Sequence, residues 1–314
     1  MDTTAGRRRY LGLDLGGTNI KVAVVEEQVG EPGSGAGSSP PELVAQESHP
    51  TQAQRGPEAV VGRLAEVGRA ALERHGAMAA VGVGIAGIHD ERGHAVLLPN
   101  LPGDWSGVPV QAPLAKAFGQ PVTLVNDARA FSLAESLLGA ARGLGTVVCL
   151  VLGTGVGGGV VVDGHLLLGT GIAGELGHQT VQLDGPPCGC GNLGCVEALT
   201  RADVFASLGG RATAQEVYAA ARDGDALAQA AVDHVVRWLA VALANAYVLL
   251  APDAFVVGGG IAAAGDLLLD PLERAVRSHV FHAPPERIRV LPGKLGPFAG
   301  ATGAALRGRE AAAG

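Results

Sequence analysis

The residues best suited to chemistry lie between Glu175 and Glu197, where the chain reads ELGHQTVQLDGPPCGCGNLGCVE. One histidine and three of the chain's four cysteines gather here, namely His178, Cys188, Cys190 and Cys195. Thiolates and an imidazole at such short separations can form a tetrahedral shell around zinc. Because Glu175 and Glu197 flank these four residues, we expect a structural zinc ion whose loop also presents acids to a polar substrate.

Two alternatives exist for the cysteines: small buried apolar side chains, or a disulfide. Cys188 and Cys190 are separated by one residue, which is too close for easy disulfide geometry. The start MDTTAGRRRYLGLDLGG contains no secretory hydrophobic region, so we expect a cytoplasmic protein, in which clustered cysteines are more often metal ligands. Cys149, within TVVCLVLG, is expected to be an ordinary buried thiol.

A second set of chemical residues surrounds a glycine pair near the start of the chain. Glycines let the backbone approach an anion closely, Thr18 can donate a hydroxyl, and Asp14 can orient a hydrated Mg²⁺ ion. The alternative is a simple tight turn. The predicted phosphate contacts are Asp14, Gly16, Gly17, Thr18, Asn19 and Lys21.

Two further glycine clusters are expected to hold the rest of a nucleotide. Both 82–87 and 153–158 match G-x-G-x-x-G, but no helix is expected to open at either match, so neither predicts a dinucleotide fold. A strand-to-strand turn at 153–155 instead suits a second phosphate contact. At 258–260 a strand ends in glycines that are expected to open a helix, which suits the adenosine end of a nucleotide; the alternative is a close strand-to-helix turn. The predicted residues are Gly153, Thr154, Gly155, Gly258, Gly259 and Gly260.

The predicted catalytic residue is Asp127, which follows Asn126 at the carboxyl end of the expected strand PVTLVND. A carboxylate there can accept the proton of an alcohol that attacks a γ-phosphorus. The alternative role for Asp127 is a helix N-cap. Further side chains with the chemistry to hold a sugar are Asn126, Glu175, His178 and Glu197, with Gly87 and Asn100 as additional candidates.

The elements that must position these residues form a repeated pattern. Strands are expected at 10–15, 19–27 and 42–48, followed by a helix at 57–75 and two more strands. A similar order of strands follows from 145 onward. The further expected helices lie at 128–141, 213–250, after 260 and at 299–313. We therefore predict two α/β lobes with a cleft between them: 1–125 plus the C-terminal helix 299–314, and 126–298 carrying the zinc motif. The Gly/Ser-rich segment 30–41 is expected to be a loop.

Bulk properties restrict the class of protein. The chain has 314 residues, enough for two cores, and aromatic residues make up only 4%, so these cores must be aliphatic. The net charge of −7 argues against a general nucleic-acid binder. No apolar run is expected to span a membrane.

Taken together, these motifs resemble the ROK family (repressors, open reading frames, kinases), particularly its zinc-containing glucokinases, over nearly the whole chain. DLGGTNIK and GTGVGGG resemble the two phosphate motifs of the family, VNDA its catalytic segment, and GELGHQTVQLDGPPCGCGNLGCVE its sugar-and-zinc signature. The resemblance implies an actin-like ATPase (ribonuclease H-like) fold whose lobes close on ATP and a hexose. It also implies Mg²⁺, structural zinc, a role in glycolysis and assembly into homodimers or homotetramers.

The expected activity is ATP-dependent phosphorylation of glucose to glucose 6-phosphate, with Asp127 as general base. The departures RAFSLAE and IAGIHDERG from the family pattern lie near the sugar and make the hexose less secure. Kinases for fructose, mannose, allose or N-acetylmannosamine are therefore alternatives. A sugar-responsive transcription regulator is not expected, because residues 1–9 leave no room for a DNA-binding domain. Polyphosphate is a further alternative as donor, although relatives of that type tend to lack the zinc cysteines.

Overall fold

The computed structural model describes residues 6–29 and 40–313, so most of the expected loop 30–41 lies outside the described residues. The chain divides into two compact units: unit 1 is Met1–Leu138 with Pro297–Gly314, and unit 2 is Gly139–Gly296. The sequence-based boundary after residue 125 differs from this division. Helix α3 (Asp127–Leu137) belongs to unit 1, because it packs along α9 (Ala299–Ala313).

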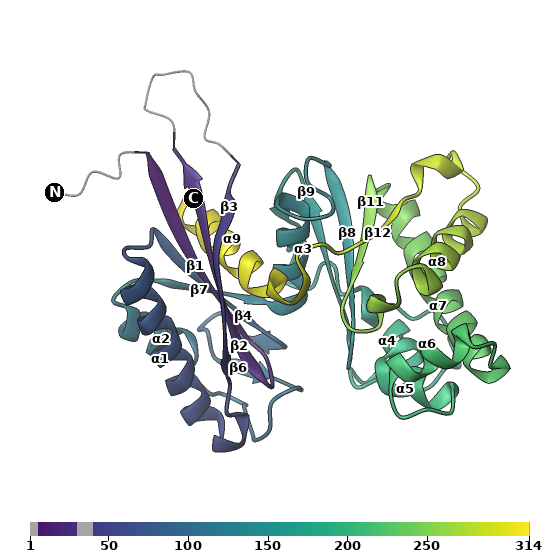
Figure 1. The fold of residues 1–314 in the computed structure, drawn as a ribbon, viewed down its shortest axis with the longest axis horizontal. Helices are drawn as coiled ribbons and strands as arrows, with labels where there is room; N and C mark the ends of the chain where they lie inside the picture. Colours follow the sequence, from purple (N-terminus) through teal and green to yellow (C-terminus); the bar gives the residue numbers. More distant parts are fainter. Residues whose placement is uncertain (1–5, 30–39, 314) are drawn as a thin grey trace. The chain divides into compact units, whose positions relative to one another are not determined.

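Unit 1 is a five-stranded sheet in the order β3-β2-β1-β4-β7 (Figure 1). Strands β1, β2 and β3 are antiparallel, and β1, β4 and β7 are parallel. Their bounds are Arg7–Leu15, Asn19–Gln28, Glu42–Pro50, Ala80–Ile85 and Val122–Asn126 for β1, β2, β3, β4 and β7. The strand hairpin and the two further strands predicted from the glycine-bounded apolar runs are thus confirmed, and the structure adds that these two strands run parallel to β1.

Helices cover both faces of this sheet. Because successive strand residues point to opposite faces, Leu13 faces α1 (Pro57–His75) and its neighbour Gly12 faces α9. The short helix α2 (Gln111–Phe118) packs beside α1. Helix α1 has the bounds that its apolar spacing predicts, with Val60, Leu64 and Val67 buried.

Unit 2 repeats this topology, with the sheet order β10-β9-β8-β11-β12. The antiparallel strands are β8 (Thr146–Leu152), β9 (Val156–Val162) and β10 (His165–Leu166), and β11 (Ala254–Gly258) and β12 (Val290–Pro292) add in parallel to β8. The positions of β8, β9, β10, β11 and β12 correspond to those of β1, β2, β3, β4 and β7. The predicted internal repeat of a two-lobed α/β fold is confirmed at the level of sheet order.

The helices of unit 2 are α4 (Val196–Thr200), α5 (Ala202–Leu208), α6 (Ala214–Arg222), α7 (Ala226–Leu250) and α8 (Asp266–His279). The expected helical stretch 213–250 is two helices, because Thr213 and Glu216 form a capping box on α6 and Asp225 caps α7 through a 2.8 Å bond from the Ala228 amide. The helix expected at 128–141 ends at Leu137.

Several short elements were not predicted. They are the hairpin β5 (Ile88–His89) with β6 (Ala95–Leu97) and the single 3₁₀ turns η1 (Ala53–Arg55), η2 (Leu176–His178), η3 (Ala262–Ala264), η4 (Pro285–Arg287) and η5 (Gly296–Phe298). Elements of two or three residues carry too little periodicity for a sequence pattern to indicate them.

Helix α7 departs from the expectation that no apolar run is long enough to span a membrane. Among the described helices it alone is long and apolar enough to cross a membrane, by length and composition only. Half of its most apolar window is buried inside the protein, and Val235, Leu239 and Leu243 belong to the aliphatic core of unit 2. These properties are those of a core helix.

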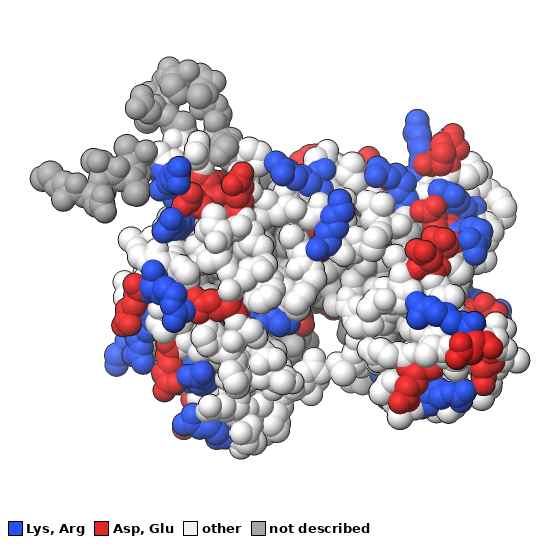
Figure 2. All heavy atoms as spheres, viewed as in Figure 1, with Lys and Arg blue, Asp and Glu red and all other residues white. Residues whose placement is uncertain are grey.

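Charged side chains are scattered over the face that Figure 2 shows. On the face that Figure 2 shows, acidic and basic residues alternate among uncharged ones and do not form one extended basic area. The net charge of the whole chain is −7.

Candidate active site

The glycine turn between β1 and β2 is held by a residue that the sequence did not single out. Thr51, fully buried, donates from its hydroxyl to the Gly16 carbonyl at 2.7 Å, and its amide donates to the Thr18 carbonyl at 2.9 Å. The Gly16 amide donates to the Asn19 carbonyl at 3.1 Å. These bonds fix the backbone of the turn, while Thr18 stays exposed at its tip. The only sequence signal for Thr51 is its place three residues after the expected strand 42–48.

Asp14, at the base of this turn, occupies a tight corner of unit 1. It pairs with Lys21 across the β1–β2 ladder, and a Cβ placed on Gly300 of α9 would lie 2.6 Å from Asp14 Oδ2. Burial, followed by the negative charge of Asp127, raises the pKa of Asp14 to about 7, while Lys21 acts in the opposite direction. Two acids thus lie close enough to influence each other, with one lysine beside them.

Asn126, not Asp127, caps helix α3. Its Oδ1 accepts from the amides of Ala128 and Arg129 at 3.0 and 3.2 Å, and its Nδ2 donates to the Gly87 carbonyl at 3.2 Å. Asp127 is the first helical residue, and its Oδ1 accepts from the Ala128 amide at 2.9 Å. The N-cap alternative for Asp127 is therefore wrong, and the side-chain oxygen of Asn126 serves the helix.

The structure also brings Gly87 and Asn100 to this end of the sheet. The Gly87 backbone has φ 150°, and a Cβ there would lie 2.0 Å from the Leu97 carbonyl oxygen, so the chain needs glycine at this position. A Cβ on Gly17 would lie 2.7 Å from the Asn100 carbonyl oxygen, so the predicted phosphate turn lies against the loop that contains Asn100. The predicted unit 1 residues thus meet around the carboxyl ends of β1, β4 and β7.

In unit 2, the turn Gly153–Gly155 joins β8 to β9 and contacts the acid Glu197. The Gly153 amide donates to the Gly155 carbonyl at 2.9 Å, which closes the turn. Glu197 Oε2 accepts from the Val156 amide at 2.9 Å, and a Cβ on Gly155 would lie 2.6 Å from the same oxygen. The second predicted phosphate turn, Gly153–Gly155, and the predicted sugar ligand Glu197 are therefore in direct contact.

The four predicted zinc residues come together. His178 ends the 3₁₀ turn η2, Cys195 directly precedes α4, and Cys188 and Cys190 lie on the loop between them. The loop is folded back by the bonds of the Cys188 amide to the Asn192 carbonyl at 2.8 Å and of the Val196 amide to the Gln179 carbonyl at 3.0 Å.

The geometry of this cluster fits a tetrahedral metal. One ligand atom from each of the four residues lies within 4.8 Å of the others. Cys190 Sγ and Cys195 Sγ are 3.7 Å apart, as are Cys188 Sγ and His178 Nδ1. Zinc with metal–sulfur bonds of about 2.3 Å requires sulfur–sulfur edges of about 3.8 Å. None of the four cysteines, all of which lie in the described part of the chain, forms a disulfide, so the disulfide alternative is wrong.

Electrostatics differ among the three thiols. Burial raises the pKa of Cys188 and raises that of Cys195 to about 12, whereas the Asn192 backbone lowers the pKa of the exposed Cys190. The donor set of three soft sulfurs and one imidazole is the kind that zinc prefers. His178 turns Nδ1 toward Cys188, which leaves Nε2 for a different partner.

Glu175 lies directly before η2, and its carbonyl accepts from the His178 amide at 3.0 Å. Close backbone contact fixes this segment on β9, since a Cβ on Gly177 would lie 1.8 Å from the Val156 carbonyl oxygen. The residues predicted to bind sugar in unit 2, Glu175, His178 and Glu197, are therefore all anchored to the start of β9.

The glycines at 258–260 differ from the expectation. Gly258 ends β11, but α8 begins only at Asp266, after the 3₁₀ turn η3, so no α-helix opens at the glycines. The Gly259 backbone has φ 91° and a Cβ there would lie 2.3 Å from the Leu152 carbonyl oxygen. Glycine is needed here because the backbone that follows β11 lies against the backbone of Leu152, the last residue of β8.

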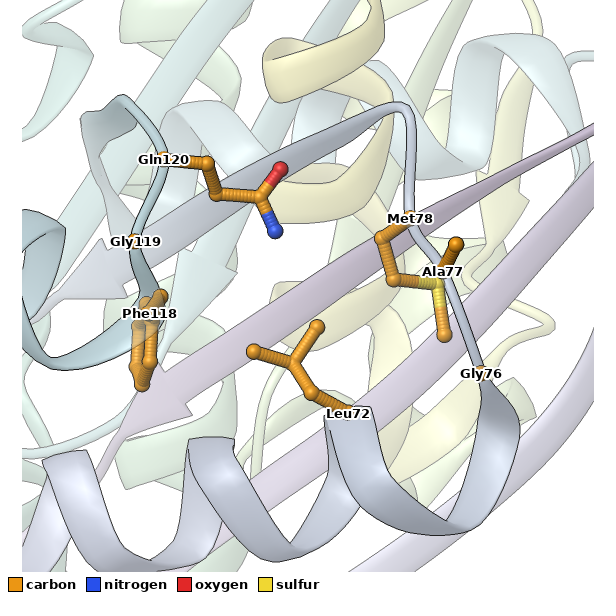
Figure 3. Close-up of a pocket in the computed structure, with 7 residues that line it drawn as sticks. All are labelled: Leu72, Gly76, Ala77, Met78, Phe118, Gly119 and Gln120. Carbon is orange, nitrogen blue, oxygen red and sulfur yellow. The ribbon is translucent and has the colours of Figure 1, made fainter.

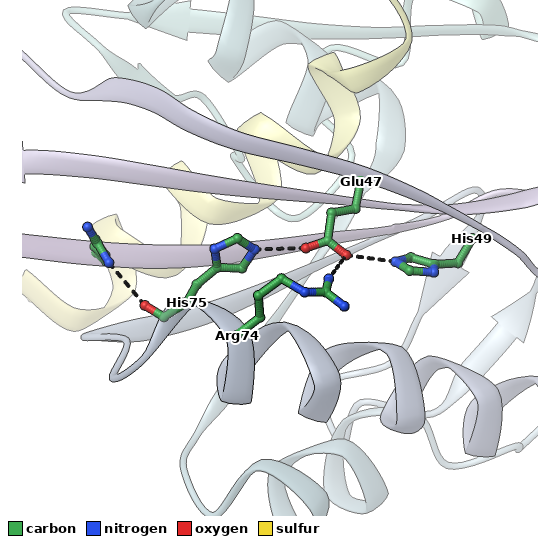
Figure 4. A network of polar contacts seen from close by, with 5 residues as sticks. Glu47, His49, Arg74 and His75 are labelled. Atoms are coloured by element: carbon green, nitrogen blue, oxygen red, sulfur yellow. Dashed lines mark hydrogen bonds and ion pairs between the residues drawn. The ribbon is translucent and has the colours of Figure 1, made fainter.

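Two other features of unit 1 share no residue with this site. A surface pocket of about 500 Å³ is lined by the ends of α1 and α2, with Leu72, Met78, Phe118 and Gln120 pointing into it (Figure 3). Glu47 of β3 accepts from Arg74, from His75 Nε2 at 2.8 Å and from His49 Nε2 at 2.9 Å, and so ties the edge strand to α1 (Figure 4).

Comparison with known proteins now identifies the family. The model of the ROK family matches residues 10–309, and the chain belongs to this family. The glucokinase of Thermotoga maritima is 37% identical over 320 residues, which cover 95% of this chain and 96% of that protein. The N-acetyl-D-glucosamine kinase of Photobacterium profundum is 31% identical over 313 residues, which cover 95% and 98%.

Solved structures give the same family and define the fold. The ROK hexokinase of Thermus thermophilus superimposes with a TM-score of 0.84 at 34% identity, covering 98% of this chain and all of that one. A ROK family glucokinase from Streptomyces griseus, solved in complex with glucose and AMPPNP, has a TM-score of 0.75 at 31% identity and covers 96% and 99%. The predicted actin-like ATPase fold is therefore confirmed.

Proposed function

We propose that this protein is an ATP-dependent glucokinase that transfers the γ-phosphoryl group to the 6-hydroxyl of glucose. The observation that carries the proposal is the group formed by Asp14, Lys21 and Asp127 at the carboxyl ends of β1 and β7, in a chain 37% identical to a glucokinase. The structure of the Streptomyces griseus glucokinase in complex with glucose and AMPPNP supports the pairing of a hexose with a nucleotide.

In this proposal Asp127 is the general base. It accepts the proton of the attacking hydroxyl while that oxygen bonds to phosphorus and the bond to the leaving ADP oxygen breaks. A carboxylate in this role is worth on the order of 10²–10⁴ in rate. The Asn126 cap fixes where helix α3 begins, and so fixes the position of Asp127.

Asp14 and the glycine turns are proposed to handle the phosphates. Gly17 and Thr18 offer amides and Thr18 a hydroxyl, in a turn that the Gly16 amide closes, and Gly153–Gly155 offers a second turn. The half-buried carboxylate of Asp14 fits the outer shell of a hydrated Mg²⁺ ion, which supplies charge neutralisation on the triphosphate when bound. Gly258, Gly259 and Gly260 are proposed to lie near the adenosine.

The hexose is proposed to bind through Glu175, His178, Glu197, Asn126, Asn100 and Gly87. Zinc is proposed to be bound by His178 Nδ1 and the sulfurs of Cys188, Cys190 and Cys195, where it orients the ring so that Nε2 can meet a sugar hydroxyl. The metal is structural here, because all four positions of its shell are filled by protein.

A sugar profile tests the proposal. Purified protein is assayed by coupled ADP release with ATP or polyphosphate as donor and with glucose, N-acetylglucosamine, N-acetylmannosamine, mannose, fructose or allose as acceptor. The largest kcat/KM is expected for ATP with glucose. Negligible turnover of glucose beside brisk turnover of another hexose would overturn the choice of substrate.

The second candidate is an N-acetylglucosamine kinase. It is favoured by relatives with that name at up to 32% identity. The substrates of the two candidate activities differ by an acetamido group at the sugar 2-position, so the same assay separates them.

We further propose a cytoplasmic enzyme of glycolysis that forms homodimers or homotetramers and does not bind nucleic acid. Light scattering of the purified protein tests the oligomer.

A further inference from the structure

Helix α9 contacts the acid Asp14 through a glycine. The Asp14 side chain projects from β1 toward the first turn of α9, where a Cβ on Gly300 would lie 2.6 Å from Oδ2, 2.8 Å from Cγ and 3.2 Å from Oδ1. Values below about 3.0 Å are shorter than real Cβ contacts, so any side chain at position 300 requires something to move. Either α9 moves or the carboxylate does.

Helix α9 is held too tightly to move away. A Cβ on Gly12 of β1 would lie 1.8 Å from the Ala301 carbonyl oxygen, and a Cβ on Gly82 of β4 would lie 1.8 Å from the Ala304 carbonyl oxygen. The helix therefore lies directly on the backbone of the two central strands. Arg309 near its other end donates to the buried Glu27 at 2.6 Å, which fixes the helix along the sheet as well.

The same helix also fixes the element that carries Asp127. A Cβ on Gly303 would lie 1.7 Å from the Ala130 carbonyl oxygen of α3, so α9 and α3 touch backbone to backbone one turn after Asp127. Gly300 and Gly303 lie three residues apart and so share a face of α9. One helix thus sets the positions of both acids.

We propose that Gly300 is a positioning residue for the phosphoryl transfer, because its missing side chain lets α9 hold the Asp14 carboxylate at a fixed place relative to Asp127. The inference rests on the proposed function for its catalytic meaning, whereas the contact itself can be tested without substrate. The carboxylate is the mobile partner in this contact, so crowding at position 300 displaces Asp14 rather than the helix.

A double-mutant cycle tests the contact. Gly300→Ala, Asp14→Ala and the double variant are compared with the wild type by thermal unfolding. Gly300→Ala is expected to lower the melting temperature by about 3–8 °C when Asp14 is present and to have almost no effect in the Asp14→Ala background, where the crowded atoms are gone. If Gly300→Ala alone does not fold, the double variant is still expected to fold. An equal loss of stability in both backgrounds would overturn the inference.

Kinetics separate a positioning role from a merely structural one. With whichever hexose the wild type turns over, Gly300→Ala is expected to lower kcat at least about tenfold while KM for the hexose changes less than about twofold. Two control variants are expected to keep kcat near the wild-type value. The first is Gly62→Ala in α1, where a Cβ meets no atom within 4 Å. The second is Ala305→Gly, which weakens α9 away from Asp14. A loss of kcat in Ala305→Gly equal to that in Gly300→Ala would refute the positioning role.

Discussion

Glu197 Oε2 accepts a hydrogen bond of 2.9 Å from the backbone amide of Val156, the first residue of β9. The acid belongs to the first turn of α4, two residues after the proposed zinc ligand Cys195, whereas the amide follows the glycine turn Gly153–Gly155. The Glu197 carboxylate therefore connects the metal loop, which is the segment His178–Cys195 with the proposed zinc ligands, to the proposed phosphate turn.

Substitutions of Glu197 separate its two roles. Glu197→Gln retains an oxygen that can accept from Val156 and is expected to keep wild-type stability, but to weaken hexose binding about tenfold or more because the carboxylate is lost. Glu197→Ala leaves a buried amide without a partner and should in addition lose ~1–3 kcal/mol of unfolding free energy. Denaturant unfolding and hexose titration measure the two effects; equal stability of both variants would contradict this account.

Removal of the proposed base is expected to affect the chemical step alone. Asp127→Ala should lower kcat by a factor on the order of 10²–10⁴. Because Asn126 caps α3, the helix should persist, and hexose affinity and bound zinc should be retained. Asp127→Asn, which keeps the size of the side chain, is the companion variant. Rates near those of the wild type in either variant would remove Asp127 as the base.

Loss of a thiolate should release the metal. Cys188→Ser is expected to abolish stoichiometric zinc, measured by elemental analysis, and to weaken hexose binding through displaced His178 and Glu197, both of which lie beside the Cys188 sulfur. Cys149→Ala, in the core of β8, should keep its zinc and serves as the control. Full activity of Cys188→Ser without metal would show that the site and the metal are not coupled.

The half-buried acid Asp14 should reduce stability at neutral pH. Its folded-state pKa of about 7 lies above the ordinary value, so its protonated form is favoured in the folded protein, and stability is lost as the pH rises from about 4 through 7. Asp14→Asn is therefore expected to stabilise the protein by ~1–3 kcal/mol at pH 8 and much less at pH 5, with loss of turnover. Unfolding curves at both pH values provide the measurement. A variant less stable than the wild type at pH 8 would contradict the burial argument.

The network around Glu47 should give the opposite pH dependence. Burial alone would raise the pKa of Glu47, but bonds from Arg74, His75 and His49 outweigh it and lower this pKa to about 2. The stabilisation is thus present above about pH 4.5 and lost as the pH falls toward 2. Glu47→Gln should cost ~1–2 kcal/mol at pH 7, and this cost should shrink in acid. Glu42→Gln, at the exposed start of the same strand, should show no such cost at either pH.

Local patterns determined much of the candidate site. The zinc loop was predictable because its four ligands lie close together in sequence, and the structure confirms that their ligand atoms meet. Helix α1 was predictable from its apolar spacing, and the sheet strands from glycine-bounded aliphatic runs. The catalytic roles of Asp127 and Asp14 remain predictions.

The errors occurred where distant segments decide the outcome. The sequence placed 128–141 in the second lobe, but the packing of α3 on α9, an element far along the chain, assigns α3 to unit 1. The helix expected directly after Gly260 begins only at Asp266, and the glycines instead follow a backbone path on which Gly259 lies against the Leu152 carbonyl of β8. Contacts of this kind leave no periodicity in the local sequence.

By itself the sequence determined the donor chemistry, the glycine turns and the repeated order of strands and helices, because each depends on residues within a few positions of one another. Only the tertiary structure decided that Thr51 fixes the Gly16 turn, that Glu197 joins Val156 to the metal loop, and that Gly300 confines Asp14. The physical reason is that these contacts join residues far apart in the chain, and only the packed backbone brings their atoms to within hydrogen-bonding or van der Waals distance.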